Sequence, residues 1–188
     1  MPAVVTSVPR LLITGAPGAG KTTVVRSVTN RLLAGGAGVA GFVTREVRQA
    51  GRRVGFEALA LDGRTATIAH VSMTTAVQVR RYGVDVAAFE GVAVPAVRGA
   101  LQAGGVVVMD ELGLMELASE RFVELVGEVF GAPVAVLATV HQRAHPVTDA
   151  IKARPDVELV TVTPENRDGL PEVLSEQFIR WWRATGRG

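Results

Sequence analysis

Cysteine is absent from this sequence, and lysine is almost absent, since only Lys21 and Lys152 occur among its 188 residues. The absence of cysteine excludes disulfide bonds and thiolate metal sites. Long apolar runs are also missing: the longest, such as PVAVLATV at residues 133–140, have the length of a strand and are too short to span a membrane. The first ten residues lack the charged and apolar regions of a signal peptide, so we expect a cytoplasmic protein without a membrane partner.

A strong excess of one charge is missing as well. The formal net charge is +2, which is too small to indicate a nucleic-acid surface, so we expect no nucleic-acid partner. Hydrophobic residues make up 48% of the chain and charged residues 20%, which is typical of a folded globular protein. The length suits one domain, predicted to span residues 1–188 with an antiparallel strand insertion at residues 42–70. The sequence predicts no oligomeric state.

Apolar segments of strand length alternate with segments of helical periodicity along the chain. Strands are predicted at residues 10–14, 39–43, 105–109, 134–140 and 157–162. Helices are predicted at residues 22–34, 86–102 (with an interruption possible at Pro95), 119–129, 148–152 and 165–182. Segments 46–48, 54–61 and 65–69 have period-two character between turn signals, which indicates antiparallel strands. The pattern predicts an α/β fold: a mostly parallel sheet with helices on both faces and an antiparallel hairpin extension.

The segment GAPGAGKT at residues 15–22 matches G-x-x-x-x-G-K-[ST] in full, between a predicted strand and a predicted helix. Glycines let backbone N–H groups turn inward around phosphate oxygens, and the helix start adds its positive end. A glycine-rich turn with an incidental lysine is the plainer interpretation, but one of only two lysines stands at the required place. We therefore predict a P-loop NTPase fold whose nucleotide site includes Gly15, Ala16, Pro17, Gly18, Ala19, Gly20, Lys21, Thr22 and Thr23.

Two acids, Asp110 and Glu111, directly follow the apolar run VVVM at residues 106–109. At the carboxyl edge of a parallel sheet, Asp110 would lie beside the phosphate loop and bind Mg²⁺ together with the Thr22 hydroxyl. Glu111 can polarise a water molecule for attack on the γ-phosphate, which favours hydrolysis over phosphate transfer by a kinase. We predict Lys21 and Glu111 as catalytic residues. The alternative is that both acids merely end a strand.

Further blocks of the sequence, combined with the phosphate loop, resemble the cancer-related nucleoside-triphosphatase family, which includes NTPases of thermophiles. These blocks are GFVTREVR, GRRVGFEALAL, YGVDVAAFE, VVVMDELGLMEL, TVHQRAHPVTDAIKAR and VTPENRDGL. The resemblance extends from Leu11 to about Leu174. It implies Mg²⁺-dependent hydrolysis of ATP, GTP and other nucleoside triphosphates to the diphosphate, with loose selectivity for the base. It also implies nucleotide contacts at residues 106–113, which adds Gly113 to the predicted site.

The sequence departs from the family pattern at Leu114, where the family commonly has lysine. If that lysine stabilises charge during catalysis, either catalysis is slower in this chain or another cation acts in its place, and the candidates for that cation are Arg45, Arg48 and Arg143. Nearby, Glu116 has two open interpretations: it is an acid that supports the acids of the site, or it belongs to a solvated face.

Polar side chains near the ends of the later strands extend the predicted site. Thr139 and His141 end the strand 134–140, where a polar group can sense the γ-phosphate, although a surface-loop histidine is an equal alternative for His141. Asn166 and Arg167 follow the last strand, where they can contact the base, Arg167 by stacking its guanidinium plane. A helix cap with a solvated arginine is the alternative for this pair.

Two other functions fit a small protein with a phosphate loop. The first is a small-molecule or nucleotide kinase, which the Glu111 position and the family blocks disfavour. The second is a nucleotide-dependent switch or an RNA-associated protein, in which hydrolysis is slow and an ordered hairpin is the output. Turnover that depends on an acceptor would favour the first alternative, and turnover stimulated by RNA would favour the second.

Overall fold

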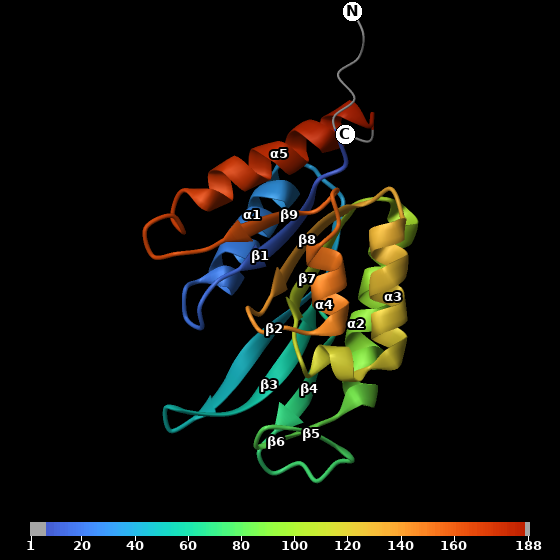
Figure 1. Cartoon of the computed structure of the whole chain (residues 1–188). Helices are drawn as coiled ribbons and strands as arrows, with labels where there is room; N and C mark the ends of the chain where they lie inside the picture. Colours follow the sequence, from blue (N-terminus) through green and yellow to red (C-terminus); the bar gives the residue numbers. More distant parts are fainter. Residues whose placement is uncertain (1–6, 187–188) are drawn as a thin grey trace, which may run out of the picture.

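One β-sheet runs through the part of the chain that this computed structural model describes, residues 7–186 (Figure 1). Residues 1–6, part of the segment predicted not to be a signal peptide, lie outside the described residues. The strands are β1 (Arg10–Thr14), β2 (Val39–Gln49), β3 (Arg52–Ala60), β4 (Thr65–His70), β5 (Val77–Val79), β6 (Tyr82–Val84), β7 (Val106–Leu112), β8 (Ala135–Val140) and β9 (Glu158–Thr161). The helices are α1 (Lys21–Ala34), α2 (Val86–Ala103), the 3-10 helix η1 (Glu116–Ala118), α3 (Glu120–Gly131), α4 (Pro146–Lys152) and α5 (Leu170–Ala184).

The sheet has two halves that meet at β2. Its strand order is β5-β6-β4-β3-β2-β7-β8-β1-β9. Strands β2, β7, β8, β1 and β9 pair in parallel, whereas β3, β4, β6 and β5 continue from the other edge of β2 as antiparallel strands. β2 serves both halves because residues 39–43 pair with β7 and residues 42–49 pair with β3. The predicted α/β fold with an antiparallel extension is confirmed.

Helices cover both faces of the parallel half (Figure 1). α1 and α5 pack together on one face, and α2 and α3 pack together on the other. The side chains of β7 alternate between the two cores: Val106 and Val108 join the core under α1 and α5, while Val107 and Met109 join the core under α2 and α3. Full burial of such a side chain contributes about 1.5–3 kcal/mol. The two acids that follow Met109 are therefore delivered to the sheet edge by a firmly anchored strand.

Several segments differ from the sequence-based prediction. The strand predicted at residues 105–109 continues as β7 through Asp110 and Glu111 to Leu112. α2 continues through Pro95, whose missing N–H leaves unpaired only a carbonyl at the exposed Gly91. α5 begins at Leu170 rather than at residue 165, because the Asn166 side chain holds residues 161–166 in a turn and Pro171 suits the first turn of a helix. β5 and β6 lie in a segment with no clear pattern, since strands of three residues are too short to display one.

Membrane-spanning helices are not part of this architecture: within residues 7–186, no helix combines the length and the apolar character that crossing a bilayer requires.

Candidate active site

A cleft of ≈ 810 Å³ opens at the carboxyl ends of the parallel strands. Four parts of the chain line it. The β1–α1 loop and the start of α1 contribute Gly15, Pro17, Gly18, Lys21, Thr22 and Arg26; β7 and the residues after it contribute Asp110, Glu111, Leu114, Met115 and Glu116. The segment after β8 contributes His141, Gln142 and Arg143, and the antiparallel extension contributes Thr44, Arg45, Glu46, Arg53, Phe56, Val79, Arg80 and Tyr82. The structure thus brings the predicted catalytic and metal-binding residues into one cleft.

The phosphate loop has the backbone that its glycines predict. Gly15 has a φ angle of 150°, and a Cβ atom at this position would lie 2.6 Å from the Val162 carbonyl oxygen, so both its conformation and its surroundings require glycine. The Lys21 ammonium donates to the carbonyl oxygens of Gly15 and Ala16, at 3.1 and 3.4 Å. These bonds fold the lysine side chain back over the loop. The loop therefore presents backbone N–H groups, a helix start and one ammonium group to the cleft.

Asp110 is a buried acid with one oxygen atom left without a partner. Its Oδ1 accepts a hydrogen bond from Thr139 at 2.6 Å, and Thr22 also bonds to the carboxyl group. Its Oδ2 is buried and has no hydrogen-bond partner among the described residues. Burial raises the pKa of Asp110, whereas the bonds from Thr139 and Thr22 and the charges of Arg26 and Lys21 lower it. The unpaired oxygen beside the Thr22 hydroxyl suits a bound cation.

Glu111 and Glu116 are neighbouring acids in the same wall of the cleft. Glu111 is half-buried, and its pKa is raised by burial and by the charge of Asp110, while Lys21 lowers it. Glu116 is only 5% exposed, and burial together with the charge of Glu111 raises its pKa to about 8. The interpretation of Glu116 as part of a solvated face is therefore wrong. The peptide bond between Asp110 and Glu111 is cis.

Gly113 does not line the cleft, but it lies directly against both of these acids. A Cβ atom at Gly113 would lie 2.7 Å from Oε2 of Glu116 and 2.9 Å from Oε1 of Glu111. A side chain at this position would push both carboxyl groups away from their places. Gly113 therefore acts on the site by leaving room for two acids, rather than through a contact of its own with the cleft.

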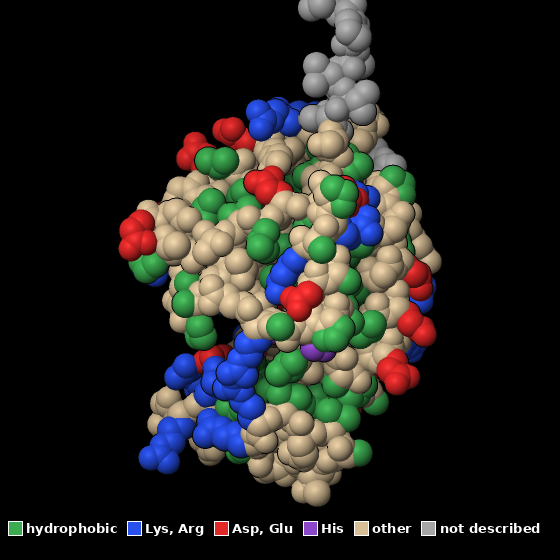
Figure 2. Space-filling model, viewed as in Figure 1, with side chains coloured by type: hydrophobic (Ala, Val, Ile, Leu, Met, Phe, Trp, Pro, Cys, Tyr) green, Lys and Arg blue, Asp and Glu red, His purple; other side chains and the backbone are tan. Residues whose placement is uncertain are grey.

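Arginine side chains line the wall of the cleft that the antiparallel extension forms. Figure 2 shows Lys and Arg side chains gathered over the β2–β3 hairpin. Arg45 is paired with Glu57 at 2.6 Å, and Arg53 is paired with Glu46 at 2.5 Å. Arg80 has a φ angle of 56°, and no ion pair of Arg80 is found within residues 7–186. This wall offers positive charge to an anion that lies on the phosphate loop.

The three arginines considered as substitutes for the family lysine at Leu114 occupy different places. Leu114 itself lines the cleft and is 40% exposed. Arg48 does not line the cleft, because Glu46 and the carbonyl oxygen of Gly51 hold it along the hairpin. Arg45 reaches the cleft but is engaged by Glu57. Arg143 lines the cleft and has no ion pair among the described residues, so it is the candidate that the geometry favours.

Thr139 and His141 differ in how they relate to the cleft. Thr139 is fully buried and holds Asp110. His141 lines the cleft, and both of its ring nitrogens are buried without a hydrogen-bond partner in the described part of the chain. Burial, followed by the charge of Lys152, lowers the pKa of His141, so the ring is neutral at pH 7 and can donate from one nitrogen. Of the two, only His141 can reach a ligand in the cleft directly.

Asn166 and Arg167 lie beside the phosphate loop rather than in the cleft. The Asn166 side chain accepts a bond from the backbone of Thr163 and donates one to the carbonyl of Thr161. Arg167 lies against the loop, since its Cδ is 3.4 Å from where a Cβ on Gly20 would be. The remaining predicted loop residues, Ala16, Ala19, Gly20 and Thr23, shape the loop and the start of α1 outside the cleft lining.

Sequence reasoning missed several residues of the cleft. Arg26 lies four residues after Thr22 on α1, a spacing that places both on one face of the helix and that would have indicated it. Arg80 and Tyr82 lie in or beside the short strands β5 and β6, where the sequence has no pattern that connects them to the phosphate loop.

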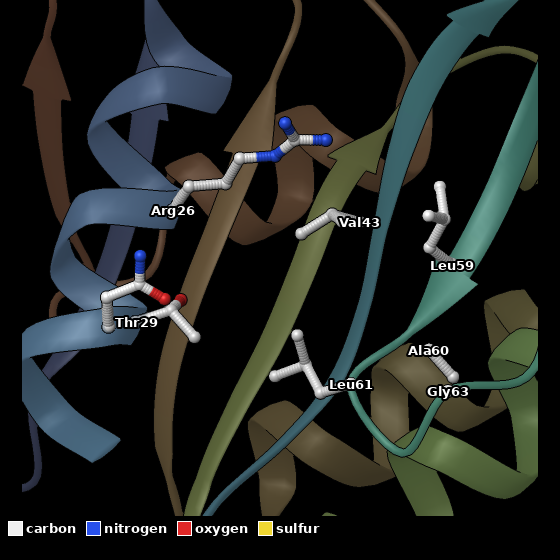
Figure 3. Close-up of a pocket in the computed structure, with 8 residues that line it drawn as sticks. Arg26, Thr29, Val43, Leu59, Ala60, Leu61 and Gly63 are labelled. Carbon is white, nitrogen blue, oxygen red and sulfur yellow. The ribbon is translucent and has the colours of Figure 1, made fainter. Parts of the chain in front are cut away.

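A second, smaller cavity of ≈ 330 Å³ lies between α1 and the sheet extension. Figure 3 shows Arg26 and Thr29 on α1 facing Val43, Leu59 and Leu61 across it. Its lining, taken from the described residues, is largely apolar and includes no acid and no residue of the phosphate loop. It is therefore a gap beside the active-site cleft, and Arg26 borders both.

The fold and the cleft together define a P-loop NTPase. The phosphate loop follows β1, the acid pair lies near the end of β7, and β8 is the strand between them in the parallel part of the sheet. The sequence matches the model of a protein family described as NTPase over residues 10–175. The chain therefore belongs to this NTPase family, which includes THEP1 and the cancer-related nucleoside-triphosphatases.

Relatives and solved structures cover most of the chain. It is 35% identical to nucleoside-triphosphatase THEP1 of Thermotoga petrophila over 86% of this chain and 88% of that protein. The crystal structure of THEP1 from the hyperthermophile Aquifex aeolicus matches with a TM-score of 0.80 and 35% identity, covering 90% of this chain and 98% of that one. The solution structure of a human cancer-related nucleoside triphosphatase matches with a TM-score of 0.77 and 33% identity, covering 89% and 96%.

Proposed function

We propose that this chain hydrolyses the terminal phosphate of ATP, GTP and other nucleoside triphosphates in a reaction that requires Mg²⁺. Activity as a nucleoside-triphosphatase follows from the family, whose members carry that name. The observation that carries the finer proposal is that Lys21, Thr22, Asp110 and Glu111 line the same cleft. An ammonium group, a hydroxyl and two acids around one phosphate loop are the groups that hydrolysis of a triphosphate needs.

The phosphate loop supplies the binding site for the triphosphate. Its N–H groups and the start of α1 favour negative charge, and they are fixed before the substrate arrives. Lys21, which is held by carbonyl oxygens of the loop, exchanges those bonds for phosphate oxygens when a nucleotide binds. Because the backbone N–H donors are already in position, they stabilise charge that develops on the phosphates without moving.

Mg²⁺ fits the residues of the cleft. Asp110 has a buried oxygen for which the described residues offer no hydrogen-bond partner, and the Thr22 hydroxyl is bonded to the same carboxyl group, so hard oxygen donors meet at one place. Asp110 and Thr22 would hold the ion together with phosphate oxygens and water. When bound, Mg²⁺ supplies positive charge that neutralises the phosphates during transfer. Thr139 keeps Asp110 oriented for this role through a bond to a charged group, which contributes roughly 1.5–3 kcal/mol.

Glu111 is the proposed base for the attacking water. It follows Asp110 directly and is half-buried, so few water molecules compete for its carboxylate. It accepts the proton of the water as that water attacks the γ-phosphate, and the bond between the γ-phosphorus and the bridging oxygen breaks. Arg143 is the proposed replacement for the family lysine missing at Leu114, because it lines the cleft and forms no ion pair with another residue of the described range 7–186.

The base of the nucleotide is proposed to lie outside the cleft, near Arg167. This side chain packs on the loop at Gly20, where it can offer a flat guanidinium surface to any base. Stacking on a guanidinium distinguishes bases poorly, which agrees with loose base selectivity. Asn166 stays a predicted contact, and its amide is engaged in the adjacent turn.

Phosphate release from ATP, GTP, CTP and UTP tests the proposal, with Mg²⁺ and with a chelator in its place. We expect release from all four with Mg²⁺ and none with the chelator. Parallel reactions add candidate phosphate acceptors or RNA. Release that proceeds equally well without them supports a hydrolase, whereas turnover that requires an acceptor would identify a kinase, and turnover that requires RNA would identify a nucleic-acid-dependent switch.

A further inference from the structure

The cleft continues beyond the place proposed for the γ-phosphate. The proposed base contact, Arg167, follows β9, whereas the proposed metal ligand Asp110 lies on β7. A triphosphate with its base near Arg167 therefore has its γ-phosphate towards β7. In the sheet, the strands on the far side of β7 are β2 and the antiparallel extension. Residues of β2, β3, β5 and β6 line the cleft, so it extends past a bound triphosphate on the γ-phosphate side. We call this part the far end of the cleft; its lining includes Phe56, Val79, Arg80, Tyr82, Leu114 and Met115.

The far end has an apolar floor that a triphosphate does not need. Phe56, Val79 and Met115 are partly buried and pack against the hydrophobic cluster that contains Tyr82. The rings of Phe56 and Tyr82 meet edge to face with their centroids 5.2 Å apart. Beside Met115, Leu114 is 40% exposed at the position where the family commonly has lysine. Apolar and aromatic side chains in the wall of a cleft suit an apolar or planar part of a ligand.

Arginine side chains stand beside this apolar floor. The guanidinium of Arg53 lies over the ring of Phe56, 5.3 Å from its centroid, and donates to the Tyr82 hydroxyl at 3.2 Å. Glu46, the acid that the extension contributes to the cleft, is paired with Arg53 at 2.5 Å. Arg80 also lines the cleft, and no acid among residues 7–186 forms an ion pair with it. The far end therefore combines an apolar surface with a cation that is open to a phosphate group.

We propose that the far end of the cleft binds the second nucleoside of a dinucleoside polyphosphate, a molecule with a nucleoside at each end of a phosphate chain longer than that of ATP. This inference rests on the proposed function, because it uses the placement of a triphosphate on the phosphate loop. Arg80 pairs with the phosphate that follows the γ-phosphate, and the second base lies on Leu114 and Phe56. Every base has a flat face that an apolar or aromatic side chain can cover. One ligand of this class accounts for the phosphate loop, the open arginine and the apolar floor, which line a single cleft.

The first test compares the binding of diadenosine tetraphosphate and of ATP to the wild-type protein by calorimetric titration. A chelator replaces Mg²⁺, so that neither ligand turns over during the measurement. The two ligands carry the same charge at alkaline pH, because the dinucleotide has no terminal phosphate, so any gain in affinity reports the second nucleoside. We expect the dinucleotide to bind about tenfold more tightly than ATP, the gain expected for covering one base. Equal or weaker binding of the dinucleotide would overturn the proposal.

The second test repeats both titrations with Leu114→Asn, which removes apolar surface from the far end. Because Leu114 is 40% exposed, the variant should melt close to wild type. We expect its affinity for ATP to stay within about twofold of wild type and the gain for the dinucleotide to fall about threefold or more. Leu33→Asn is the matched control, since Leu33 is 49% exposed on α1 and does not line the cleft. The same gain in both variants would rule out a base on Leu114.

A third titration adds AMP to the protein already bound to ATP. Saturable binding of AMP that Leu114→Asn weakens, without a gain for the dinucleotide, would assign the far end to a separate phosphate acceptor and overturn the proposal. The titrations also separate this inference from the function on which it rests. If wild type releases no phosphate from any nucleoside triphosphate but shows the gain, the proposed hydrolysis fails and the second nucleoside site stands. If ATP binds and is hydrolysed without a gain for the dinucleotide, only this inference fails, and if neither ligand binds, both fail.

Discussion

The two halves of the sheet build their sides of the cleft in different ways. The parallel half places short side chains and backbone groups near the ends of strands that are buried on both faces, as for Asp110 on β7. The antiparallel extension instead reaches the cleft with long arginine side chains from strands that are only partly buried, such as Arg45 on β2 and Arg53 on β3. The first arrangement fixes atoms to the precision that catalysis requires, and the second supplies charge.

This contrast predicts where substitutions act. Changes in the parallel half should lower kcat by large factors, because a misplaced group no longer meets the reacting atoms. Changes in the arginine wall should alter KM and the salt dependence, because exposed charges are screened and act at longer range. This contrast between the two halves would be wrong if a substitution on the extension lowered kcat as much as one on the phosphate loop.

The largest effect is expected for Lys21→Ala. This ammonium is the cation held by the phosphate loop itself, so its loss should reduce turnover by ~10²–10⁴-fold and weaken nucleotide binding. Phosphate release and equilibrium titration with ATP measure the two effects. Arg98→Ala removes a surface cation that is paired with Glu128 far along α2 and serves as the matched control. Turnover of Lys21→Ala near the control value would remove Lys21 from its proposed role.

A smaller loss, about 10–100-fold in kcat, is expected for Gly113→Ala. The added methyl group must displace the Glu111 and Glu116 carboxyl groups, while the backbone needs no unusual conformation there. Nucleotide affinity should stay within a few-fold of wild type. Gly99→Ala on the exposed side of α2 is the control, since a Cβ there meets no atom and a helix gains roughly 1 kcal/mol. Equal kcat in both variants would show that the two acids are not held against Gly113.

The smallest effect is expected for Arg80→Gln on the extension. Loss of the Arg80 guanidinium charge should raise KM for ATP about threefold and flatten the dependence of KM on salt, with little change in kcat. Arg64→Gln is the control, because Arg64 lies on the same extension but pairs with Asp62 outside the cleft. Steady-state kinetics at low and high ionic strength make the comparison. A large fall in kcat for Arg80→Gln would mean that the extension takes part in the chemistry.

The same contrast decides what the sequence could predict. The phosphate loop and the acids Asp110 and Glu111 of β7 were predictable because a local motif and a buried strand place them, and neither depends on distant contacts. Arg53, Arg80 and Tyr82 were not, because they reach the cleft only through the pairing of β3, β4 and β6, which no local pattern specifies. Glu116 was undecided, since the turn that buries it also depends on the packing of η1 against α2 and α3.

The boundaries of the elements show a similar division. The strands β1, β7 and β8 begin within one residue of their predicted starts, because continuous apolar runs mark strands that are buried on both faces, whereas β7 ends three residues later than predicted, at Leu112. The last helix was predicted five residues too early, because residues 165–169 have helical composition but are held in a turn by the Asn166 side chain.

The most direct measurement is a comparison of wild type and Glu111→Gln in ATP binding and in single-turnover phosphate release, both with Mg²⁺. Gln keeps the shape of the side chain and removes its ability to accept the proton of water. If the phosphate loop and the acids converge on one triphosphate, the variant should bind ATP within about threefold of wild type and release phosphate ~10²–10⁴-fold more slowly. Near-normal release, or loss of ATP binding, would contradict the proposed mechanism.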